Sequence, residues 1–389
     1  MKEVLITTFT YPPQQNGVAE VVCAHAEGLA RRGYRVTVAT ARDDRRAPPG
    51  PTDQPHVLSF AVSGSANPRV GCHGEVRAYQ DAVAAFDGDV IFCHCWQIWS
   101  TDLAVAAFPR SRARKVMVSH GFNAHILPPG LRFPRGFLTW IAWQPYVRRL
   151  PAMMRMFDHL VFLSGTSMAA HFHDRRVADR IGLTAWTAIP NGADPRSFSD
   201  APCDFRARHG IGEGPLLLHV GYYDPVKNQA LALRAFAGLA RGDATLVLIG
   251  PDLNAYARRL QGEWKQRGAP GGVLFLDRLS KPEIRAAYHA ADVLICSSVT
   301  ETQPLAVLDA MAAGIPFVST DVGSVSELPG GRIVRSAREM TNALRALLDH
   351  PEEKRRLADE GHSACLSTYN WEAILDRYED LIAAVCGRR

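Results

Sequence analysis

Short apolar strands alternate with helical patterns in two successive series, and this repetition limits the fold more than any other feature. Near-continuous apolar strands of this kind are typical of parallel sheets buried on both faces. Two series of βα units predict two doubly wound α/β domains rather than one eightfold barrel, which would need no restart. The strand candidates are residues 4–9, 35–40, 56–62, 89–94, 115–120, 159–164 and 187–190, then 216–221, 245–250, 273–276, 293–298, 316–320 and 332–334.

The break between the two series lies in residues 189–215, which are rich in Pro, Gly and Asp. We therefore predict an N-terminal domain of residues 1–194 and a second domain of residues 195–370. In the first domain, apolar residues at helical spacing predict a helix over Val18–Arg32. The last helix, Trp371–Val385, has an apolar face.

Composition excludes several classes of protein. The chain has 389 residues, 47% of them apolar and 21% charged, with a net charge of +5, which is ordinary for a globular protein. Its arginines are dispersed without interleaved aromatics, so we expect no nucleic-acid partner. No apolar run is long enough to span a membrane, and the eight cysteines lack a framework spacing, so we expect a cytoplasmic protein with reduced thiols. Only six basic residues are lysines, a bias typical of a GC-rich genome.

The segment Asn16–Gly17 ends the loop between the first strand and the first helix. Ligands of doubly wound sheets collect at the carboxyl ends of strands, where free helix amides bind phosphate. The loop does not have the form GxGxxG, so both a plain tight turn and a phosphate contact remain open.

Lys227 opens the helix that follows the first strand of the second domain, after a turn at Asp224–Pro225. The helix dipole makes this end favourable for anions and mildly unfavourable for a lysine. A solvated lysine is the simpler interpretation, but the electrostatics favour a cation placed to bind phosphate.

Glu301 and Asp309 are separated by eight residues, in a loop and in the helix that follows a buried strand. Two carboxylates at this edge can accept hydrogen bonds from vicinal sugar hydroxyls. The alternative is a carboxylate that complements the helix dipole together with an exposed Asp, which the apolar neighbours Leu305, Leu308 and Met311 disfavour.

Other constellations indicate no metal site and no hydrolase. His94 points away from Cys93 and Cys95 on a strand, and His171 and His173 diverge on a helix. The Asp87–Gly88–Asp89 triplet is typical of a turn before a strand. Ser164 lacks a GxSxG elbow.

Residues 132–149 combine Phe137, Trp140 and Trp143 with flanking arginines. This segment could contact a membrane surface or line an acceptor cleft, but packing in the interior is the commoner use of such a pattern. Peripheral membrane contact is therefore not favoured.

Taken together and in order, these segments resemble the retaining glycosyltransferases of family 4, which have the GT-B fold. The resemblance rests on TYPPQQNGVAEVV, SHGF at 119–122, IPNGADPRSF, HVGYYDPVKN, LDRLSKPEIR, ETQPLAVLDAMAAG and YNWEAILDRYEDL. The last of these resembles a C-terminal helix that crosses back to the first domain, so the resemblance implies that residues 371–389 pack on residues 1–194. It covers nearly the whole chain and implies two Rossmann-like domains that face each other across a cleft, with the acceptor bound by the first and the nucleotide sugar by the second.

The resemblance also implies roles for individual residues. Glu301 would contact the donor sugar, Asp309 the ribose, Lys227 the diphosphate, and His120 would lie beside the sugar, with His120, Lys227 and Glu301 as the catalytic set. The complete expected donor site is Asn16, Gly17, Gly221, Tyr222, Lys227, Arg278, Leu279, Glu301, Thr302, Gln303, Pro304, Leu305 and Asp309, and the acceptor candidates are Trp96, Trp99, His120 and Asn123.

Two positions depart from the family pattern. Asp309 stands where Glu is usual, so its contact to ribose becomes longer or bridged by water. Tyr222 stands where arginine is usual, so the diphosphate loses a bidentate partner.

The resemblance implies transfer of a hexosyl unit from a nucleotide sugar, with a UDP-sugar favoured, by a retaining route without metal or other cofactor. The arginine-rich composition would fit an actinobacterial enzyme that glycosylates a small polar acceptor such as an aminocyclitol or aminoglycoside. The alternatives are a cell-envelope glycolipid acceptor and a sugar-nucleotide-binding protein without turnover. A phosphorylase-like enzyme would need a pyridoxal lysine, and no lysine stands out for it.

Overall fold

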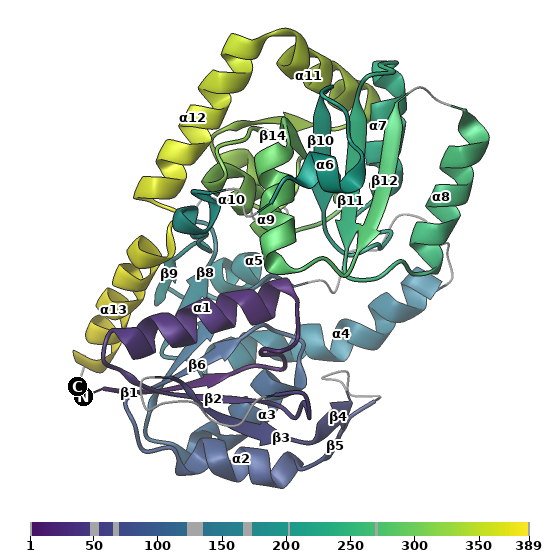
Figure 1. Cartoon of the computed structure of the whole chain (residues 1–389). Coiled ribbons are helices and arrows are strands. Elements are labelled where there is room, and N and C mark those ends of the chain that lie inside the picture. The colour runs from purple at the N-terminus through teal and green to yellow at the C-terminus, as the bar shows by residue number, and fades with distance from the viewer. Residues whose placement is uncertain are drawn as a thin grey trace. The chain divides into compact units, whose positions relative to one another are not determined.

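The computed structural model describes residues 2–46, 54–64, 70–122, 135–165, 173–200, 203–268 and 271–387, with backbone alone at 135–139. The chain divides into two compact units (Figure 1). Unit 1 contains the described residues up to 191 together with 371–387, and unit 2 contains those between 192 and 370.

Unit 1 is built on a seven-stranded parallel sheet in the order β3-β2-β1-β6-β7-β8-β9. Its strands are β1 (Glu3–Thr7), β2 (Arg35–Ala41), β3 (His56–Phe60), β6 (Val90–His94), β7 (Arg114–Val118), β8 (His159–Phe162) and β9 (Trp186–Ala188). A separate antiparallel pair is formed by β4 (Val62–Gly64) and β5 (Cys72–Gly74). The predicted strand 56–62 is therefore divided at Ala61, since its last residue pairs with β5 instead of β2.

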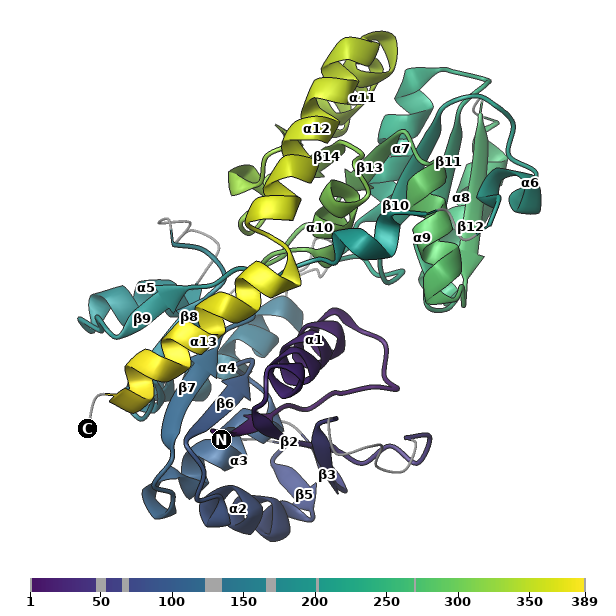
Figure 2. The same ribbon diagram turned by 60° about the vertical axis from the view of Figure 1, so that its left-hand side comes forward.

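Helices cover both faces of this sheet. They are α1 (Gly17–Arg31), α2 (Val76–Ala85), α3 (Trp99–Ala107), η1 (Phe108–Arg110), α4 (Arg135–Met154), α5 (His173–Arg180) and α13 (Trp371–Gly387). One face packs on α1 and α13, and the opposite face packs on α2, α3, α4 and α5. Figure 2 shows α13 and α1 on the same side of the sheet.

Ion pairs reinforce the packing of α13 on α1. Arg32, which caps α1, donates from Nη1 to Asp376 and Glu379 at 2.6 Å each and from Nη2 to Glu372 at 2.8 Å. The three carboxylates lie on one face of α13. Ile374, Leu375 and Tyr378 of the same helix are buried in the core of unit 1. The last helix is thus a structural part of unit 1.

Unit 2 repeats the same plan with a six-stranded parallel sheet in the order β12-β11-β10-β13-β14-β15. The strands are β10 (Leu216–Val220), β11 (Thr245–Gly250), β12 (Gly272–Asp277), β13 (Val293–Cys296), β14 (Phe317–Thr320) and β15 (Gly331–Val334). One face packs on α7 (Gln229–Leu239), α8 (Ala255–Arg267) and α11 (Ala337–Asp349). The other packs on α6 (Phe205–His209), α9 (Lys281–Ala290) and α10 (Leu305–Ala312). The remaining elements are η2 (Pro195–Phe198), η3 (Val325–Glu327) and α12 (Pro351–Ser367).

Each sheet reverses its strand order once. In unit 1 the reversal lies between β1 and β6, and in unit 2 it lies between β10 and β13. The crevice at the carboxyl ends of two such strands is where doubly wound proteins bind their ligands. The predicted fold class of two doubly wound parallel sheets is confirmed. The two strand reversals indicate the edge of each sheet where a ligand site is expected.

Candidate functional site

The loop from β10 to α7 places Lys227 at the switch point of unit 2. Asp224 organises this loop because its Oδ1 accepts the amide of Val226 at 2.7 Å and its carbonyl accepts that of Lys227 at 2.9 Å. α7 begins at Gln229, so Lys227 lies in the loop two residues before the helix instead of opening it as predicted. Its side chain runs back beside Gly221, where an added Cβ would lie 3.6 Å from Cδ of Lys227.

The loop from β13 to α10 brings Glu301 to the same point. Oε1 of Glu301 accepts hydrogen bonds from Nζ of Lys227 and from Oγ of Ser298, each at 2.6 Å. The backbones of the two loops are also joined, since the amide of Val299 donates to the carbonyl of Val226 at 2.8 Å. The structure thus brings together the predicted catalytic residues Lys227 and Glu301.

The charges of this pair stabilise each other. Burial lowers the pKa of Lys227, but the charge and hydrogen bond of Glu301, together with Cys296 and Asp224, raise it, and the pKa ends above its usual value. The ammonium of Lys227 is therefore fully charged at neutral pH. A partly buried cation beside the first turn of α7 can bind an anionic ligand.

The loop between Glu301 and α10 is held in place by the backbone of residues 323–324, which approaches it closely. The carbonyl of Thr302 accepts the amide of Ser324 at 2.9 Å, and a Cβ added to Gly323 would lie 2.1 Å from that oxygen. Gln303 and Pro304 are buried, whereas Thr302 and Leu305 are half-buried. No side chain caps α10. These residues, predicted as donor contacts, therefore shape a loop that ends at free helix amides.

Tyr222 and Arg278 are the exposed members of the predicted donor site in unit 2. The Tyr222 side chain is 44% exposed, and its carbonyl accepts Nε2 of Gln229 at 2.7 Å. The Arg278 side chain is 82% exposed, with Nε 3.2 Å from Asp277. Leu279 is half-buried and packs against the core. Both exposed side chains are accessible to a ligand.

Asp309 lies half-buried about one turn into α10. Burial, and then the Asp309 carboxylate, raise the pKa of Tyr288 well above its usual value and that of Cys365 to about 12. Because Tyr288 belongs to α9 and Cys365 to α12, the Asp309 carboxylate lies on the side of α10 that faces these two helices.

In unit 1, Asn16 caps α1 at the carboxyl edge of β1. Its Oδ1 accepts the amide of Ala19 at 2.9 Å, and its Nδ2 donates to Oγ1 of Thr10 at 2.7 Å. The Thr10 hydroxyl donates in turn to Gln14 at 2.6 Å. These bonds hold the loop and leave Gly17 exposed. The cap shows why asparagine stands at this position, and it is compatible with a ligand at the helix amides.

Three histidines meet across the switch point of unit 1. Nδ1 of His94, at the end of β6, lies 3.0 Å from Nε2 of His120, which follows β7. Nε2 of His94 lies 3.3 Å from Nδ1 of His25 in α1. Sequence reasoning selected His120 but not His25 or His94. The overlooked signal was a histidine at the carboxyl end of each of two adjacent strands.

The two tryptophans predicted to stack on an acceptor are core residues instead. Trp96 is 3% exposed and donates from Nε1 to the buried Asp174 at 3.2 Å, and Trp99 is 7% exposed and packs against Tyr79. This corrects the expectation that they offer ring faces to a ligand. The sequence between β6 and α3 turns inward, with Cys95 and Gln97 at positive φ. Another acceptor candidate, Asn123, lies outside the described residues.

The described part of α4 packs in the interior. Tyr146 and Leu150 are fully buried, and Trp143 lies against the same core, whereas Trp140 is 38% exposed. In the predicted segment 132–149, Trp143, Tyr146 and Val147 thus pack on the core, whereas Trp140, Arg148 and Arg149 are exposed. Among the described residues, no helix has the length and apolarity that crossing a bilayer requires.

In the described ranges, no three His, Cys, Asp or Glu side chains are grouped so as to hold a metal ion. All eight cysteines are free thiols. Asp89 accepts the amide of Glu3 at 2.8 Å, which gives the Asp87–Gly88–Asp89 triplet a structural role before β6.

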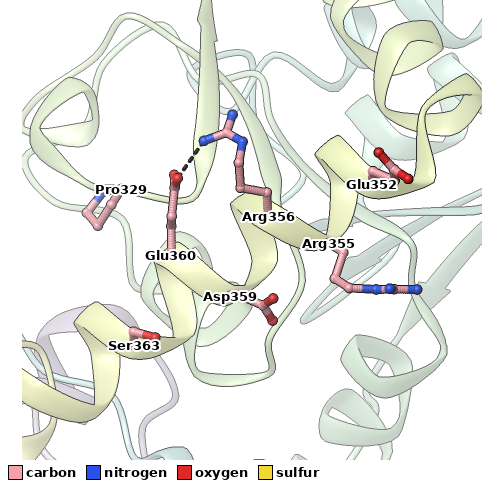
Figure 3. Close-up of a pocket in the computed structure, with 7 residues that line it drawn as sticks. All are labelled: Pro329, Glu352, Arg355, Arg356, Asp359, Glu360 and Ser363. Carbon is pink, nitrogen blue, oxygen red and sulfur yellow. Dashed lines mark hydrogen bonds and ion pairs between the residues drawn. The ribbon is translucent and has the colours of Figure 1, made fainter.

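A shallow hollow on unit 2 lies away from the switch point (Figure 3). Six of its lining residues come from α12, and Arg356 and Glu360 pair with each other along that helix. None of them belongs to the predicted site. We assign the hollow no function, since it is formed mostly by one exposed helix whose Arg356 already pairs with Glu360. Its lining residues are Pro329, Glu352, Arg355, Arg356, Asp359, Glu360 and Ser363.

Comparisons with known proteins agree with this layout. A family model described as Glycosyltransferase Family 4 matches residues 15–197, and one described as Glycosyl transferases group 1 matches residues 214–350. The lipopolysaccharide 1,2-N-acetylglucosaminetransferase of Salmonella typhimurium is 27% identical over 52% of this chain and 57% of its own length. The MMP alpha-(1->4)-mannosyltransferase of Mycolicibacterium hassiacum is 28% identical over 62% of this chain and 59% of its own. The chain thus spans less than two thirds of these curated relatives.

Solved structures share the fold at low sequence identity. Sucrose-phosphate synthase from Thermosynechococcus elongatus has a TM-score of 0.78 at 19% identity and covers 100% of both chains. HepE of Anabaena, in complex with UDP and glucose, has a TM-score of 0.76 at 16% identity over 99% of this chain and 100% of its own. The two family models match the two halves of the chain in order, and together they cover most of it. The chain therefore combines a family 4 glycosyltransferase domain with a group 1 glycosyltransferase domain, and it has the two-domain GT-B fold.

Proposed function

We propose that the protein is a retaining, metal-independent hexosyltransferase that moves a sugar from a nucleotide sugar, with a UDP-sugar favoured, to a hydroxyl of a small polar acceptor. The observation that supports this most directly is the cluster of Lys227, Glu301 and Ser298 at the β10/β13 switch point. It combines a cation, a carboxylate and helix amides at the edge where a doubly wound sheet binds nucleotides.

The parts of the cluster suit the parts of a nucleotide sugar. The Lys227 ammonium and the first amides of α7 suit a diphosphate, whose negative charge grows as it leaves. The Glu301 carboxylate suits sugar hydroxyls, because it is acceptor-only when ionised. Arg278 and Leu279 follow β12, and we propose that they contact the base. Asp309 would contact the ribose, through a bridging water where its side chain, one methylene shorter than that of glutamate, does not reach directly.

The proposed reaction takes place on one face of the sugar. The acceptor oxygen forms a bond to the anomeric carbon while the bond from that carbon to the diphosphate oxygen breaks. The leaving diphosphate takes the acceptor proton, and the sugar keeps its configuration. Lys227 and the α7 amides would stabilise the departing charge, which is the task that other enzymes give to a metal ion.

A small polar acceptor, such as an aminocyclitol or aminoglycoside, is supported by the polar edge of unit 1. Hydrogen-bonding groups of Thr10, Gln14 and Asn16 gather after β1, and His120 follows β7. The alternative is a cell-envelope glycolipid, as the name of the Salmonella relative suggests for that protein. Tyr146 is buried and Trp143 packs against the core of unit 1, which leaves Trp140 as the exposed aromatic side chain of the described part of α4 and makes a lipid contact there less favourable.

The test is a screen of nucleotide sugars by thermal shift, followed by mass spectrometry with aminocyclitol and glycolipid acceptors. We expect a product whose anomeric configuration by NMR matches that of the donor and whose rate is unchanged by a chelator. An inverted product, a trapped covalent glycosyl-enzyme or loss of activity on chelation would each contradict the proposal.

A binding protein without turnover is the second candidate, and Tyr222 is the observation that favours it. Without an arginine at this position, the site could hold a nucleotide sugar and fail to activate it. Donor binding with neither transfer nor slow hydrolysis would establish this alternative.

A further inference from the structure

The three histidines of unit 1 form a continuous row from α1 to the loop after β7. His25 and His94 are 1% and 0% exposed, and the ring nitrogens of successive residues lie 3.3 and 3.0 Å apart. The row ends at His120, the residue that the family resemblance implies to lie beside the sugar and that the proposed function includes in the polar edge of unit 1. The two inner histidines have no part in that function so far.

All three rings are neutral near pH 7. Burial lowers the pKa of His25 to about 3 and that of His120 to about 4, and it lowers the pKa of His94 well below its usual value. A neutral imidazole has one N–H donor and one acceptor nitrogen. The direction of donation in one hydrogen bond of the row therefore determines the direction of donation in the next.

The buried end of the row selects one direction. The ring of His25 is enclosed by Phe92, with centroids 5.0 Å apart, and by Tyr378 of α13, at 4.0 Å. Its Nε2 is buried with no hydrogen-bond partner among the described residues. A proton on Nε2 would be an orphan N–H donor, which proteins avoid more strictly than an unused acceptor. The proton of His25 therefore belongs on Nδ1.

We propose that His25 and His94 are positioning residues that hold His120 in its Nδ1–H tautomer. The chain of donation runs from Nδ1 of His25 to Nε2 of His94, and from Nδ1 of His94 to Nε2 of His120. The Nε2 lone pair of His120 is then occupied, and Nδ1–H is its donor. His120 therefore serves a ligand as a hydrogen-bond donor and not as a general base.

The tautomer can be measured without any substrate. Nitrogen-15 NMR on the full chain with labelled histidines distinguishes protonated from bare ring nitrogens, and the spectrum of His120→Asn assigns the His120 signals. We expect His120 with a protonated Nδ1 and a bare, hydrogen-bonded Nε2. A protonated Nε2 on His120 would overturn the proposal, because the row would then run in the opposite direction.

Two conservative variants of His94 separate positioning from packing. The amide nitrogen of asparagine falls near Nδ1 of a histidine, and that of glutamine falls near Nε2. His94→Asn should keep a donor to His120 and its Nδ1–H signal, whereas His94→Gln should lose both. Equal tautomer populations of His120 in the two variants would overturn the proposal.

The consequence for the reaction rests on the proposed function and is measured separately. With UDP-glucose as the probe, His94→Gln should lower kcat about tenfold or more with a smaller change in KM, as loss of a partner that orients a functional histidine does. His94→Asn should retain most of kcat. His159→Asn, which removes a buried histidine of β8, is the matched control for packing. Absence of turnover in the wild type would contradict the proposed function, while the NMR comparison would still decide the tautomer.

Discussion

Nζ of Lys227 lies 2.6 Å from Oε1 of Glu301, so the cation of the unit 2 switch point is already neutralised by a carboxylate. The side chains are 28% and 13% exposed, which makes the pair partly desolvated. A diphosphate that binds Lys227 must share it with Glu301 or displace that contact. Donor binding is therefore coupled to the freedom of Glu301 to meet sugar hydroxyls.

Replacing Lys227 by Met should reduce transfer strongly, because the departing diphosphate loses its nearest charged partner. We expect kcat/KM to fall by about 10²–10³-fold, the scale for one lost stabiliser of transition-state charge. Steady-state kinetics with the donor found by the screen measure this. A loss of tenfold or less would mean that another cation holds the charge.

The same variant leaves Glu301 without its cation and should destabilise the fold by about 1–2 kcal/mol, a value between those of exposed and buried pairs. The double variant Lys227→Met/Glu301→Gln removes both charges and should recover most of that stability without recovering activity. Chemical denaturation of the two variants distinguishes a functional loss from a folding defect. Recovery of activity in the double variant would contradict the assigned role of Lys227.

The sequence predicted the fold well because its strands are continuous apolar runs. Such runs are buried on both faces, so the alternation of apolar strands with helical patterns was enough to locate both series of strands. The predicted ends of most strands differ from those in the structure by one or two residues. Residues 56–62 were the exception, since the change of partner at Ala61 depends on tertiary pairing. Local patterns contain no such information.

Single side chains were harder to predict. Lys227 and Glu301 follow strands that pair directly, so their meeting followed from topology. Trp96 also follows a strand but turns inward to Asp174, a residue 78 positions further along the chain. The row of histidines joins α1, β6 and the loop after β7, and no spacing in the sequence predicts contacts among three separate elements.

Gly323→Ala should damage the site through the backbone. Gly323 has a φ of 51°, and an added Cβ would lie 2.1 Å from the carbonyl oxygen of Thr302. The loop that carries Glu301 must then shift, at a cost of about 1–3 kcal/mol in the free energy of unfolding and with lower kcat/KM. Gly262→Ala, in α8 with nothing within 4 Å of the added Cβ, is the matched control. It should raise stability by about 0.5–1 kcal/mol and leave activity unchanged; similar unfolding curves for the two variants would contradict the argument.

The stability of the protein should fall in mild acid, in part through His219. Burial, and then the charge of Lys227, lower its pKa to about 4 in the fold, against about 6.5 when unfolded. Below about pH 6.5 the unfolded chain takes up a proton that the folded chain refuses until about pH 4. This site therefore removes about 1.4 kcal/mol of stability per pH unit as the pH falls through that window.

The stability of His219→Gln should fall less steeply than that of the wild type over the same pH range. The two slopes should differ by about the amount that the uptake of one proton contributes. Denaturant titrations of both proteins at several pH values between 7 and 4 measure the two slopes. Other acid-sensitive groups are common to both chains and cancel in the difference. Parallel slopes would show that His219 is protonated equally in the folded and unfolded states.

Tyr222→Arg should strengthen donor binding, because it restores a second cation where the ligand's diphosphate is expected. The tyrosine side chain is 44% exposed, so a longer side chain can extend into solvent without disturbing the core. One charge-assisted hydrogen bond corresponds to about a tenfold lower Kd for the nucleotide sugar. Tyr222→Leu is the control that removes the ring without adding charge, and calorimetry with UDP compares the three proteins. If arginine and leucine bind UDP equally, the diphosphate lies away from residue 222, and Lys227 with the α7 amides must provide its binding alone.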